Sequence, residues 1–258
     1  MFVREVGCGP AVLLLHGTPS PAEDWLPLAD ALARDYRVLI PDLPGYGQSP
    51  DPVDARIERI GDALAAMLAD RGVTRLHGLV GYSTGAYRAF DLATRARIDA
   101  SVIVSLAGVA CFDALARETR ATLAAQLAAD PEFLHGDELR AVLRDLMISP
   151  AWATAHPRDV VRVLAWPHTT RAGALARELA ALARSRDLRP ELAKLRSRVY
   201  CRVGTLDRGC PPGWSAEIAE LAPRATLELV FGCGHAILLE DGPATIGAIR
   251  RELAAEPV

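Results

Sequence analysis

The fold is decided by residues 76–85, which read LHGLVGYSTG. An apolar run over residues 76–82 predicts a buried strand, and a helix is expected from Thr84 to about Arg95. Between them lies a G-x-S-x-G pattern centred on Ser83. In this setting the turn is sharp, and the glycines on either side remove side chains that would clash. The pattern alone is equally typical of a serine that caps a helix, but the strand–turn–helix setting favours a nucleophile raised above the sheet.

Strands and helices alternate on both sides of this stretch. Apolar runs predict further strands at residues 12–15, 37–40, 100–106, 199–203 and 226–231. Helical spacing of apolar residues predicts helices at about residues 23–34, 57–68, 212–221 and 236–253. Alternating elements of this kind indicate an α/β protein with a mostly parallel, doubly wound sheet and helices on both faces.

The alternation stops between residues 111 and 186. Ala, Leu and Arg dominate this segment, prolines interrupt it at four positions, and nothing in it has the pattern of a parallel strand. We therefore expect a core made of residues 1–110 and 187–258. Residues 111–186 form a helical insertion over one edge of the sheet, which is not an independent domain.

Composition narrows the class of protein. The 258 residues carry a formal net charge of −3, which provides neither a basic field for nucleic acid nor a polybasic membrane anchor. No apolar run approaches the roughly 20 residues of a membrane span, and the first residues lack the apolar core of a signal peptide. The five cysteines are scattered, which favours neither a disulfide framework nor a zinc site. We expect a cytoplasmic protein that binds no nucleic acid, membrane or metal; its oligomeric state stays open.

A nucleophilic serine needs a base, and His235 is the predicted one. It follows the last predicted strand in a Gly-Cys-Gly-His turn, from which it can reach across the strand ends. His16 also ends a strand, but the Gly-Thr-Pro that follows is better suited to presenting backbone donors. His77 lies within a strand, where a histidine is more often structural. The other three histidines, His135, His156 and His168, lie in the helical insertion and could line a pocket or face solvent.

The acid that orients the base is predicted to be Asp207. It stands in Gly204-Thr205-Leu206-Asp207, directly after the strand at residues 199–203, and so in the same layer as Ser83 and His235. A structural alternative for Asp207 is helix capping. Asp113, which follows the strand at residues 100–106, is the reserve candidate.

Five segments in order resemble the α/β-hydrolase fold superfamily. They are His16-Gly17-Thr18-Pro19 with Trp25 downstream, residues 42–49 (DLPGYGQS), residues 81–85 (GYSTG), residues 204–207 (GTLD) and Gly234-His235. The resemblance covers most of the chain and implies a helical cap inserted after the sixth strand of the family fold. Members usually carry a β-hairpin before the His16 segment, so the first sheet edge is expected to be trimmed here.

The resemblance also implies a chemistry. The order Ser, Asp, His along the chain is that of this family's catalytic triad. It implies oxyanion donors on the backbone N–H groups of Thr18 and Thr84, and it implies no metal or organic cofactor. The expected reaction is acyl transfer through an acyl-enzyme on Ser83.

Substrate choice is expected to lie with the cap. Trp152, His156, Trp166 and His168 are the predicted roof of a semi-polar pocket, although the two tryptophans could equally form the cap's own small core. Leu146, Met147 and Ile148 are expected to serve packing rather than recognition. No arginine cluster demands an anionic substrate. These features favour a small or medium, largely apolar ester, lactone or thioester as the substrate.

Two other functions stay open at this stage. A lyase or a carbon–carbon bond hydrolase could use the same triad on the same scaffold, because a fold does not determine a reaction. A ligand-binding, receptor-like protein with little turnover is the other alternative, and the complete Ser-His-Asp set weighs against it.

Overall fold

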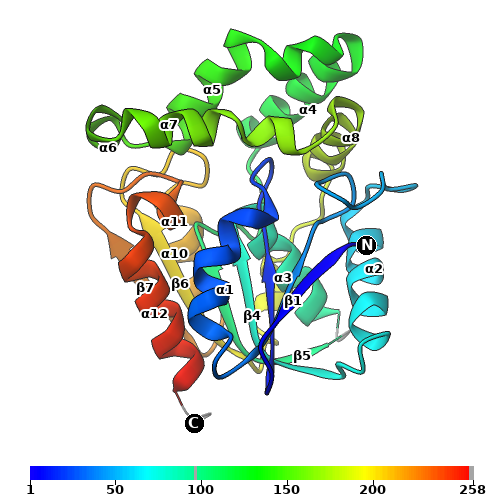
Figure 1. Cartoon of the computed structure of the whole chain (residues 1–258), viewed down its shortest axis with the longest axis vertical. Helices are drawn as coiled ribbons and strands as arrows, with labels where there is room; N and C mark the ends of the chain where they lie inside the picture. The colour runs from blue at the N-terminus through cyan, green and yellow to red at the C-terminus, as the bar shows by residue number, and fades with distance from the viewer. Residues whose placement is uncertain (96–97, 256–258) are drawn as a thin grey trace.

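The computed structural model describes residues 1–95 and 98–255, which form a seven-stranded sheet under a layer of helices (Figure 1). The strand order is β1-β3-β2-β4-β5-β6-β7. The strands are β1 (Val3–Val6), β2 (Ala11–Leu15), β3 (Arg37–Pro41), β4 (Arg75–Tyr82), β5 (Asp99–Leu106), β6 (Arg198–Gly204) and β7 (Ala225–Val230). Strands β2 to β7 run parallel to one another, so the predicted mostly parallel sheet is confirmed.

Strand β1 is the one strand of this sheet that the sequence patterns did not predict. It pairs antiparallel with β3, with Val3 opposite Pro41, at the edge expected to be trimmed. Its four residues include Arg4 and Glu5, so it lacks an apolar run. Charged side chains are common on edge strands because they discourage pairing with other chains.

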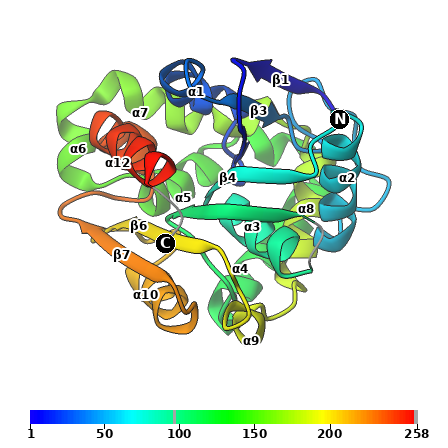
Figure 2. The ribbon, with the colours of Figure 1, turned by 90° about the horizontal axis from the view of Figure 1, so that it is seen from below.

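The sheet is covered on both faces because its central strands are apolar on both sides. In β2, Val12 and Leu14 pack in one hydrophobic core, and Leu13 and Leu15 pack in the other. Helices α1 (Leu26–Leu32) and α12 (Gly242–Ala254) cover the first face (Figure 2). The second is covered by α2 (Ile57–Ala69), α3 (Thr84–Thr94), α9 (Arg189–Leu192) and α10 (Pro212–Leu221). This two-sided burial is typical of parallel sheets.

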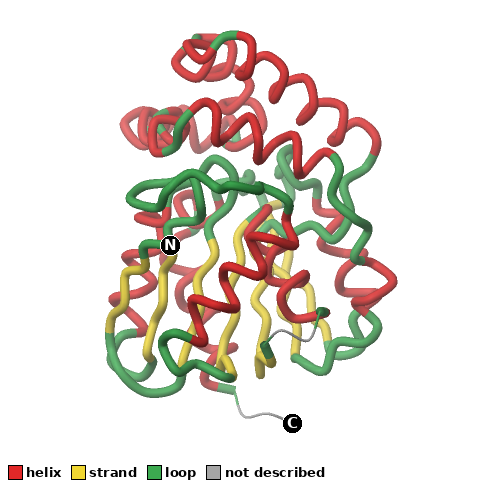
Figure 3. Tube along the Cα trace, turned by 90° about the vertical axis from the view of Figure 1, so that its right-hand side faces the viewer, coloured by secondary structure: helices red, strands yellow, loops and turns green. Residues whose placement is uncertain are grey.

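The helical layer, which we call the cap, comprises residues 114–183. It contains α4 (Ala114–Ala129), α5 (Asp137–Met147), α6 (Pro150–Ala155), α7 (Pro157–Leu164) and α8 (Ala172–Ala183), with short 3₁₀ helices at Pro131–His135 and Trp166–Thr169. A third 3₁₀ helix, Ala22–Trp25, precedes α1. Figure 3 shows loops lying between the cap and the strands, on the side where the parallel strands end. Any site at those strand ends therefore lies beneath the cap.

The last predicted helix is divided in two. Helix α11 (Ile237–Glu240) ends before Asp241, and α12 then begins with a proline in its first turn. Proline is tolerated there because the first N–H groups of a helix have no partner within it. Residues 96–97 and 256–258, which belong to the predicted core ranges, lie outside the described residues.

Candidate active site

Ser83 occupies a strained turn between β4 and α3. Its φ is 57° and its ψ is −122°, a conformation that residues other than glycine rarely adopt. The neighbouring glycines make the turn possible: a Cβ on Gly81 would lie 2.5 Å from the backbone of Ala86, and one on Gly85 would lie 2.2 Å from the carbonyl oxygen of Leu15. The G-x-S-x-G pattern thus meets a local steric requirement, and the serine stands at the carboxyl end of the sheet.

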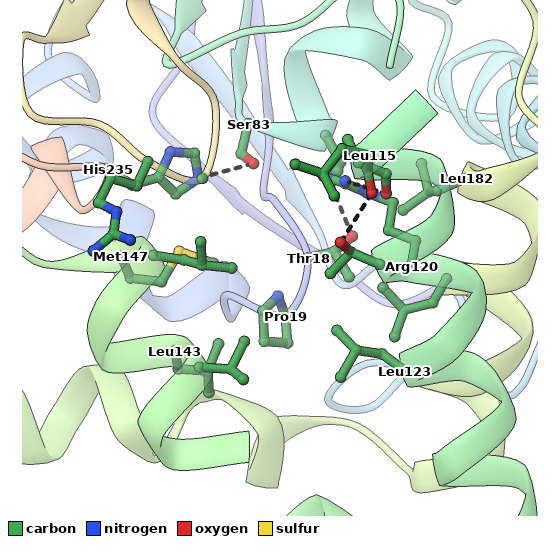
Figure 4. A pocket seen from close by; sticks show the side chains of 18 of the residues that line it. Thr18, Pro19, Ser83, Leu115, Arg120, Leu123, Leu143, Met147, Leu182 and His235 are labelled. Atoms are coloured by element: carbon green, nitrogen blue, oxygen red, sulfur yellow. Dashed lines mark hydrogen bonds between the residues drawn. The ribbon is translucent and has the colours of Figure 1, made fainter. Parts of the chain in front are cut away.

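The structure brings His235 and Asp207 to this serine from two other strand ends. The His235 Nε2 atom lies 3.0 Å from the Ser83 hydroxyl oxygen (Figure 4). The His235 Nδ1 atom lies 2.8 Å and 2.9 Å from the two carboxylate oxygens of Asp207. Because the ionised carboxylate only accepts hydrogen bonds, Nδ1 carries the proton. In the neutral ring Nε2 is then left as an acceptor for the Ser83 hydroxyl, as a general base requires.

Burial and further contacts hold these three residues. Ser83, Asp207 and His235 are 4%, 4% and 1% exposed. The Cys210 backbone N–H donates to Asp207 at 2.7 Å, and the Tyr82 hydroxyl donates to the His235 carbonyl at 3.0 Å. The ring therefore has little freedom to turn away from the serine.

Thr18 and Thr84 lie side by side next to the serine. Their hydroxyl oxygens are 2.8 Å apart, and a Cβ on the adjacent Gly17 would lie 3.0 Å from the Ser83 Cβ. Thr84 is the first residue of α3, so its backbone N–H has no partner within the helix. The positive end of the helix dipole lies at the same place and favours negative charge.

A buried polar cluster behind these threonines was missed by the sequence analysis. Glu178 of cap helix α8 accepts hydrogen bonds from the hydroxyls of Thr18 at 2.8 Å and Tyr46 at 2.6 Å, and it forms an ion pair with Arg88 of α3. Arg88 also donates to the Thr84 hydroxyl at 2.9 Å. Burial and the Glu178 carboxylate raise the pKa of Tyr46 well above its ordinary value. The sequence shows only that Glu178 and Arg88 each stand among apolar residues of a predicted helix. This pattern does not reveal that the two side chains pair.

His16 lies close by but has a structural environment. Its Nε2 accepts the Leu43 backbone N–H at 3.0 Å, and its Nδ1 lies 2.9 Å from the Gly17 carbonyl oxygen. Both bonds are made at once only by the neutral ring with its proton on Nδ1. Burial lowers the pKa of His16 from 6.5 to about 4, so the ring is neutral near pH 7.

A cavity of about 220 Å³ opens between Ser83 and the cap. Ser83, His235, Thr18 and Thr84 form its polar end. Its other lining residues are mostly apolar and come largely from α4, α5 and α8, including Leu123, Leu139, Leu143, Leu175, Leu179 and Leu182. An acyl chain in this cavity would lie against leucines and place its carbonyl at the serine.

The structure places the four predicted roof residues away from this cavity, whose lining includes none of them. Trp166 is buried in the core with its ring 6.5 Å from that of Tyr82. Trp152 stacks on His156, and His168 contacts the ring of His135. These side chains serve packing within the cap or lie at its surface.

Two of the residues expected to serve packing do pack in a hydrophobic core and also face the cavity. Leu146 and Met147 both line the cavity, whereas Ile148 is buried outside the lining. The sequence could not show that the first two also line the cavity, because an apolar side chain has the same sequence pattern whether it faces a core or a ligand.

The remaining candidates are accounted for individually. Asp113 is the N-cap of α4 and accepts the Ala116 backbone N–H at 2.8 Å, at an exposed position on the cavity lining. His77 contacts the Leu253 carbonyl oxygen at 2.7 Å and stacks on Tyr36. The five cysteines are unpaired thiols, and within residues 1–95 and 98–255 no three His, Cys, Asp or Glu side chains gather as metal ligands would.

Comparison with known proteins identifies the family. Residues 12–248 match the model of the alpha/beta hydrolase family. The chain belongs to this family. Both the resemblance stated from the sequence motifs and the predicted fold class are thereby confirmed.

Two relatives illustrate the similarity. A pimeloyl-[acyl-carrier protein] methyl ester esterase of Xanthomonas campestris pv. campestris is 30% identical over 267 residues, covering 100% of both chains. The enzyme of the same name from Aeromonas hydrophila subsp. hydrophila is 33% identical over 214 residues, covering 79% of this chain and 81% of its own.

Solved structures share the fold. An esterase of Thermogutta terrifontis superposes with a TM-score of 0.88 at 23% identity, covering 98% of this chain and 94% of its own. An enol-lactonase of Burkholderia xenovorans gives a TM-score of 0.88 at 20% identity, covering 98% of this chain and 96% of its own.

In the described part of the chain, every helix is too short or too polar to cross a membrane.

Proposed function

We propose that this chain is a serine esterase in which Ser83 is the nucleophile, His235 the general base and Asp207 the orienting acid. The observation that carries the proposal is the hydrogen-bonded series Asp207–His235–Ser83 at the end of an apolar cavity. The esterase relatives support the class of bond, and the prediction of an α/β-hydrolase acting on ester-type bonds is confirmed at that level.

In the first half of the proposed reaction, His235 Nε2 takes the proton from the Ser83 hydroxyl as the serine oxygen attacks the ester carbonyl carbon. Asp207 stabilises the imidazolium that forms. The backbone N–H groups of Thr18 and Thr84 donate to the carbonyl oxygen as it becomes negative. Loss of one such donor typically costs about 3 kcal/mol of transition-state stabilisation. The tetrahedral intermediate then expels the alcohol, which receives the proton from His235.

In the second half, water replaces the alcohol. His235 removes a proton from a water molecule, and the hydroxide oxygen attacks the carbonyl carbon of the acyl-enzyme. The bond to Ser83 breaks, the serine oxygen recovers a proton from His235, and the carboxylic acid leaves. Every proton in both halves passes through one imidazole, which explains why its tautomer must be held.

The cavity supports a largely apolar acyl group. Most of its lining residues are apolar, and many of them are leucines of the cap. The relatives named above are methyl ester esterases, which favours a small alcohol as the leaving group. We therefore propose a small-molecule ester with an aliphatic acyl chain as the substrate.

The predicted organisation into a core of residues 1–110 and 187–258 and a cap of residues 111–186 is part of the proposal. It is supported by the helices of the cap, which lie over the strand ends and supply most of the cavity wall (Figure 1). The net charge of −3 agrees with a substrate that is not a nucleic acid. The cytoplasmic location stays a prediction.

The proposal is tested by labelling with a fluorophosphonate probe, read by intact mass and peptide mapping. The wild-type chain should take up one probe, on the peptide that contains Ser83, and Ser83→Ala should take up none. Ser105→Ala removes another buried serine, on the neighbouring strand β5, and should be labelled like wild type. A folded wild-type chain that takes up no probe would contradict the acyl-enzyme mechanism.

A further inference from the structure

Arg120 is a cation in a cavity wall made mostly of apolar residues, where Asp113, Thr119 and Arg208 are the other polar side chains outside the Ser83 end. It lies on α4 and lines the cavity together with Leu123 and Leu182 (Figure 4). Its guanidinium donates one hydrogen bond, at 3.0 Å, to the carbonyl of Ala116, one turn earlier in the helix. Its Cζ atom lies 4.1 Å from the centre of the Phe112 ring. A guanidinium has five N–H donors, so most of its hydrogen-bonding capacity is not used by these contacts.

Among the described residues, no carboxylate forms an ion pair with Arg120. Two other arginines at the site do have such partners: Arg88 pairs with Glu178, and Arg208 pairs with Asp145. Asp113 also lines the cavity, but its carboxylate caps the start of α4. Within residues 1–95 and 98–255, the charge of Arg120 therefore has no carboxylate at ion-pair distance, and the Asp113 carboxylate acts on it only from further away.

An unpaired charge next to apolar groups is costly unless something compensates for it. Burial already lowers the pKa of Arg120. The Phe112 contact compensates in part, since a cation over an aromatic face is attracted to it. A ring covers only the face of a guanidinium, however, and the N–H groups at its edge stay available for a planar anion.

We propose that Arg120 binds a carboxylate of the substrate, and that the preferred substrates are esters with a free carboxylate at the far end of an apolar chain. Half-esters of aliphatic dicarboxylic acids have this chemistry. The proposal rests on the function proposed above and specifies its substrate class. A carboxylate matches the two parallel N–H bonds of a guanidinium edge. Figure 4 shows Arg120 on the side of the pocket away from His235, with leucines nearby to accommodate the chain.

The test compares matched pairs of esters on the full chain. Monomethyl esters of glutaric, adipic and suberic acids are each paired with the methyl alkanoate of the same chain length. The ratio of kcat/KM for the charged ester to that for the neutral ester should exceed one in wild type. In Arg120→Met the ratio should fall by about tenfold to a hundredfold, because a charge-assisted pair is lost while the side-chain volume is kept. An unchanged ratio would overturn the proposal.

Two further variants sharpen this test. Arg120→Lys keeps the charge without the planar fork and should give a ratio between those of wild type and Arg120→Met. Arg140→Met removes an arginine of α5 that lies outside the cavity lining and pairs with Asp137, and it should leave the ratio as in wild type. Melting curves establish that each variant is folded.

A binding measurement separates this proposal from the proposed function and does not depend on turnover. Adipate should bind to Ser83→Ala by calorimetry at concentrations at which adipamide does not, and the Ser83→Ala/Arg120→Met chain should lose this binding. Adipate that binds no better than adipamide would overturn the carboxylate site. Wild type that hydrolyses none of the esters, yet binds adipate through Arg120, would overturn the esterase and not the carboxylate site.

Discussion

Ser83 and Leu143 line the same cavity, but different parts of the molecule place them there. Ser83 stands at the end of a strand in a turn that glycines on both sides make possible. Leu143 lies on one face of a cap helix, where several other apolar residues would serve as well. The strand-end site depends on particular chemical groups at particular backbone positions. The cap wall depends only on apolar volume.

This difference determines what each region reveals in its sequence. A catalytic histidine or a turn glycine has few replacements, so the strand-end site carries motifs. A leucine of the cavity wall has many possible replacements, so the cap carries no comparable motif. The same contrast predicts that substitutions of Ser83, Asp207 and His235 act mainly on rate, whereas substitutions in the cap act on selectivity or on stability. Four experiments test this contrast.

The largest effect is expected at Asp207, the proposed orienting acid. Asp207→Asn should lower kcat/KM by about 10³- to 10⁴-fold, because the amide favours the wrong tautomer of His235. Asp113→Asn, at the capping position of α4, should change it by less than about tenfold. Ester hydrolysis by the two purified variants is the measurement. A larger loss of kcat/KM in Asp113→Asn than in Asp207→Asn would indicate that Asp113 is the acid and would contradict the proposed triad.

The next effect is one of stability, at the ion pair between cap and core. Glu178→Gln leaves Arg88 buried without its partner and should lower the free energy of unfolding by about 3 to 5 kcal/mol. Glu118→Gln, an exposed substitution on the neighbouring α4, should change it by less than about 0.5 kcal/mol. Urea unfolding measures both. Equal stabilities for the two variants would show that this pair does not fasten the cap to the core.

A smaller effect is expected from pH, through His16. Its pKa is lowered to about 4 in the fold against 6.5 in the unfolded chain, so the unfolded state binds more protons between these values. The contribution of the neutral His16 ring to the free energy of unfolding is complete above pH 6.5 and is lost as the pH falls towards 4. It amounts to about 3 kcal/mol. His16→Gln should flatten this part of the curve of unfolding free energy against pH; a variant with the wild-type slope would contradict the assignment.

The smallest effect is expected on chain-length selectivity. Leu143→Ala enlarges the cavity and should shift the ratio of kcat/KM for long against short acyl esters by about tenfold. Trp166→Ala, in the core packing of the cap, should lower the melting temperature and leave this ratio as in wild type. Rates with a series of methyl alkanoates would decide. If the ratio shifted in Trp166→Ala and not in Leu143→Ala, Trp166 would contact the acyl chain as the predicted pocket roof does.

The local sequence pattern predicts the strands and site residues of the core well, but it does not predict which cap residues line the cavity. Residues 76–85 contain the strand, the turn and the helix start in one stretch, so Ser83 could be placed without tertiary information. For Trp152 and Trp166 the sequence allows a place in the pocket roof or in the packing of the cap, and the structure places both outside the cavity lining. Strand β1 was missed because its four residues include two charges and become a strand only by pairing with β3.

The sequence alone determined the α/β architecture, the helical insertion and the candidates Ser83, Asp207 and His235. These depend on short-range periodicity and on turn residues whose backbone geometry few alternatives can adopt. The three-dimensional fold was needed to show which leucines face the cavity, that Glu178 pairs with Arg88, and that Arg120 has no carboxylate at ion-pair distance within the described residues. Each of those facts joins residues distant in sequence or depends on which side of a helix faces a neighbour. Side-chain type does not encode that choice, because burial against another element and burial against a ligand favour the same residues.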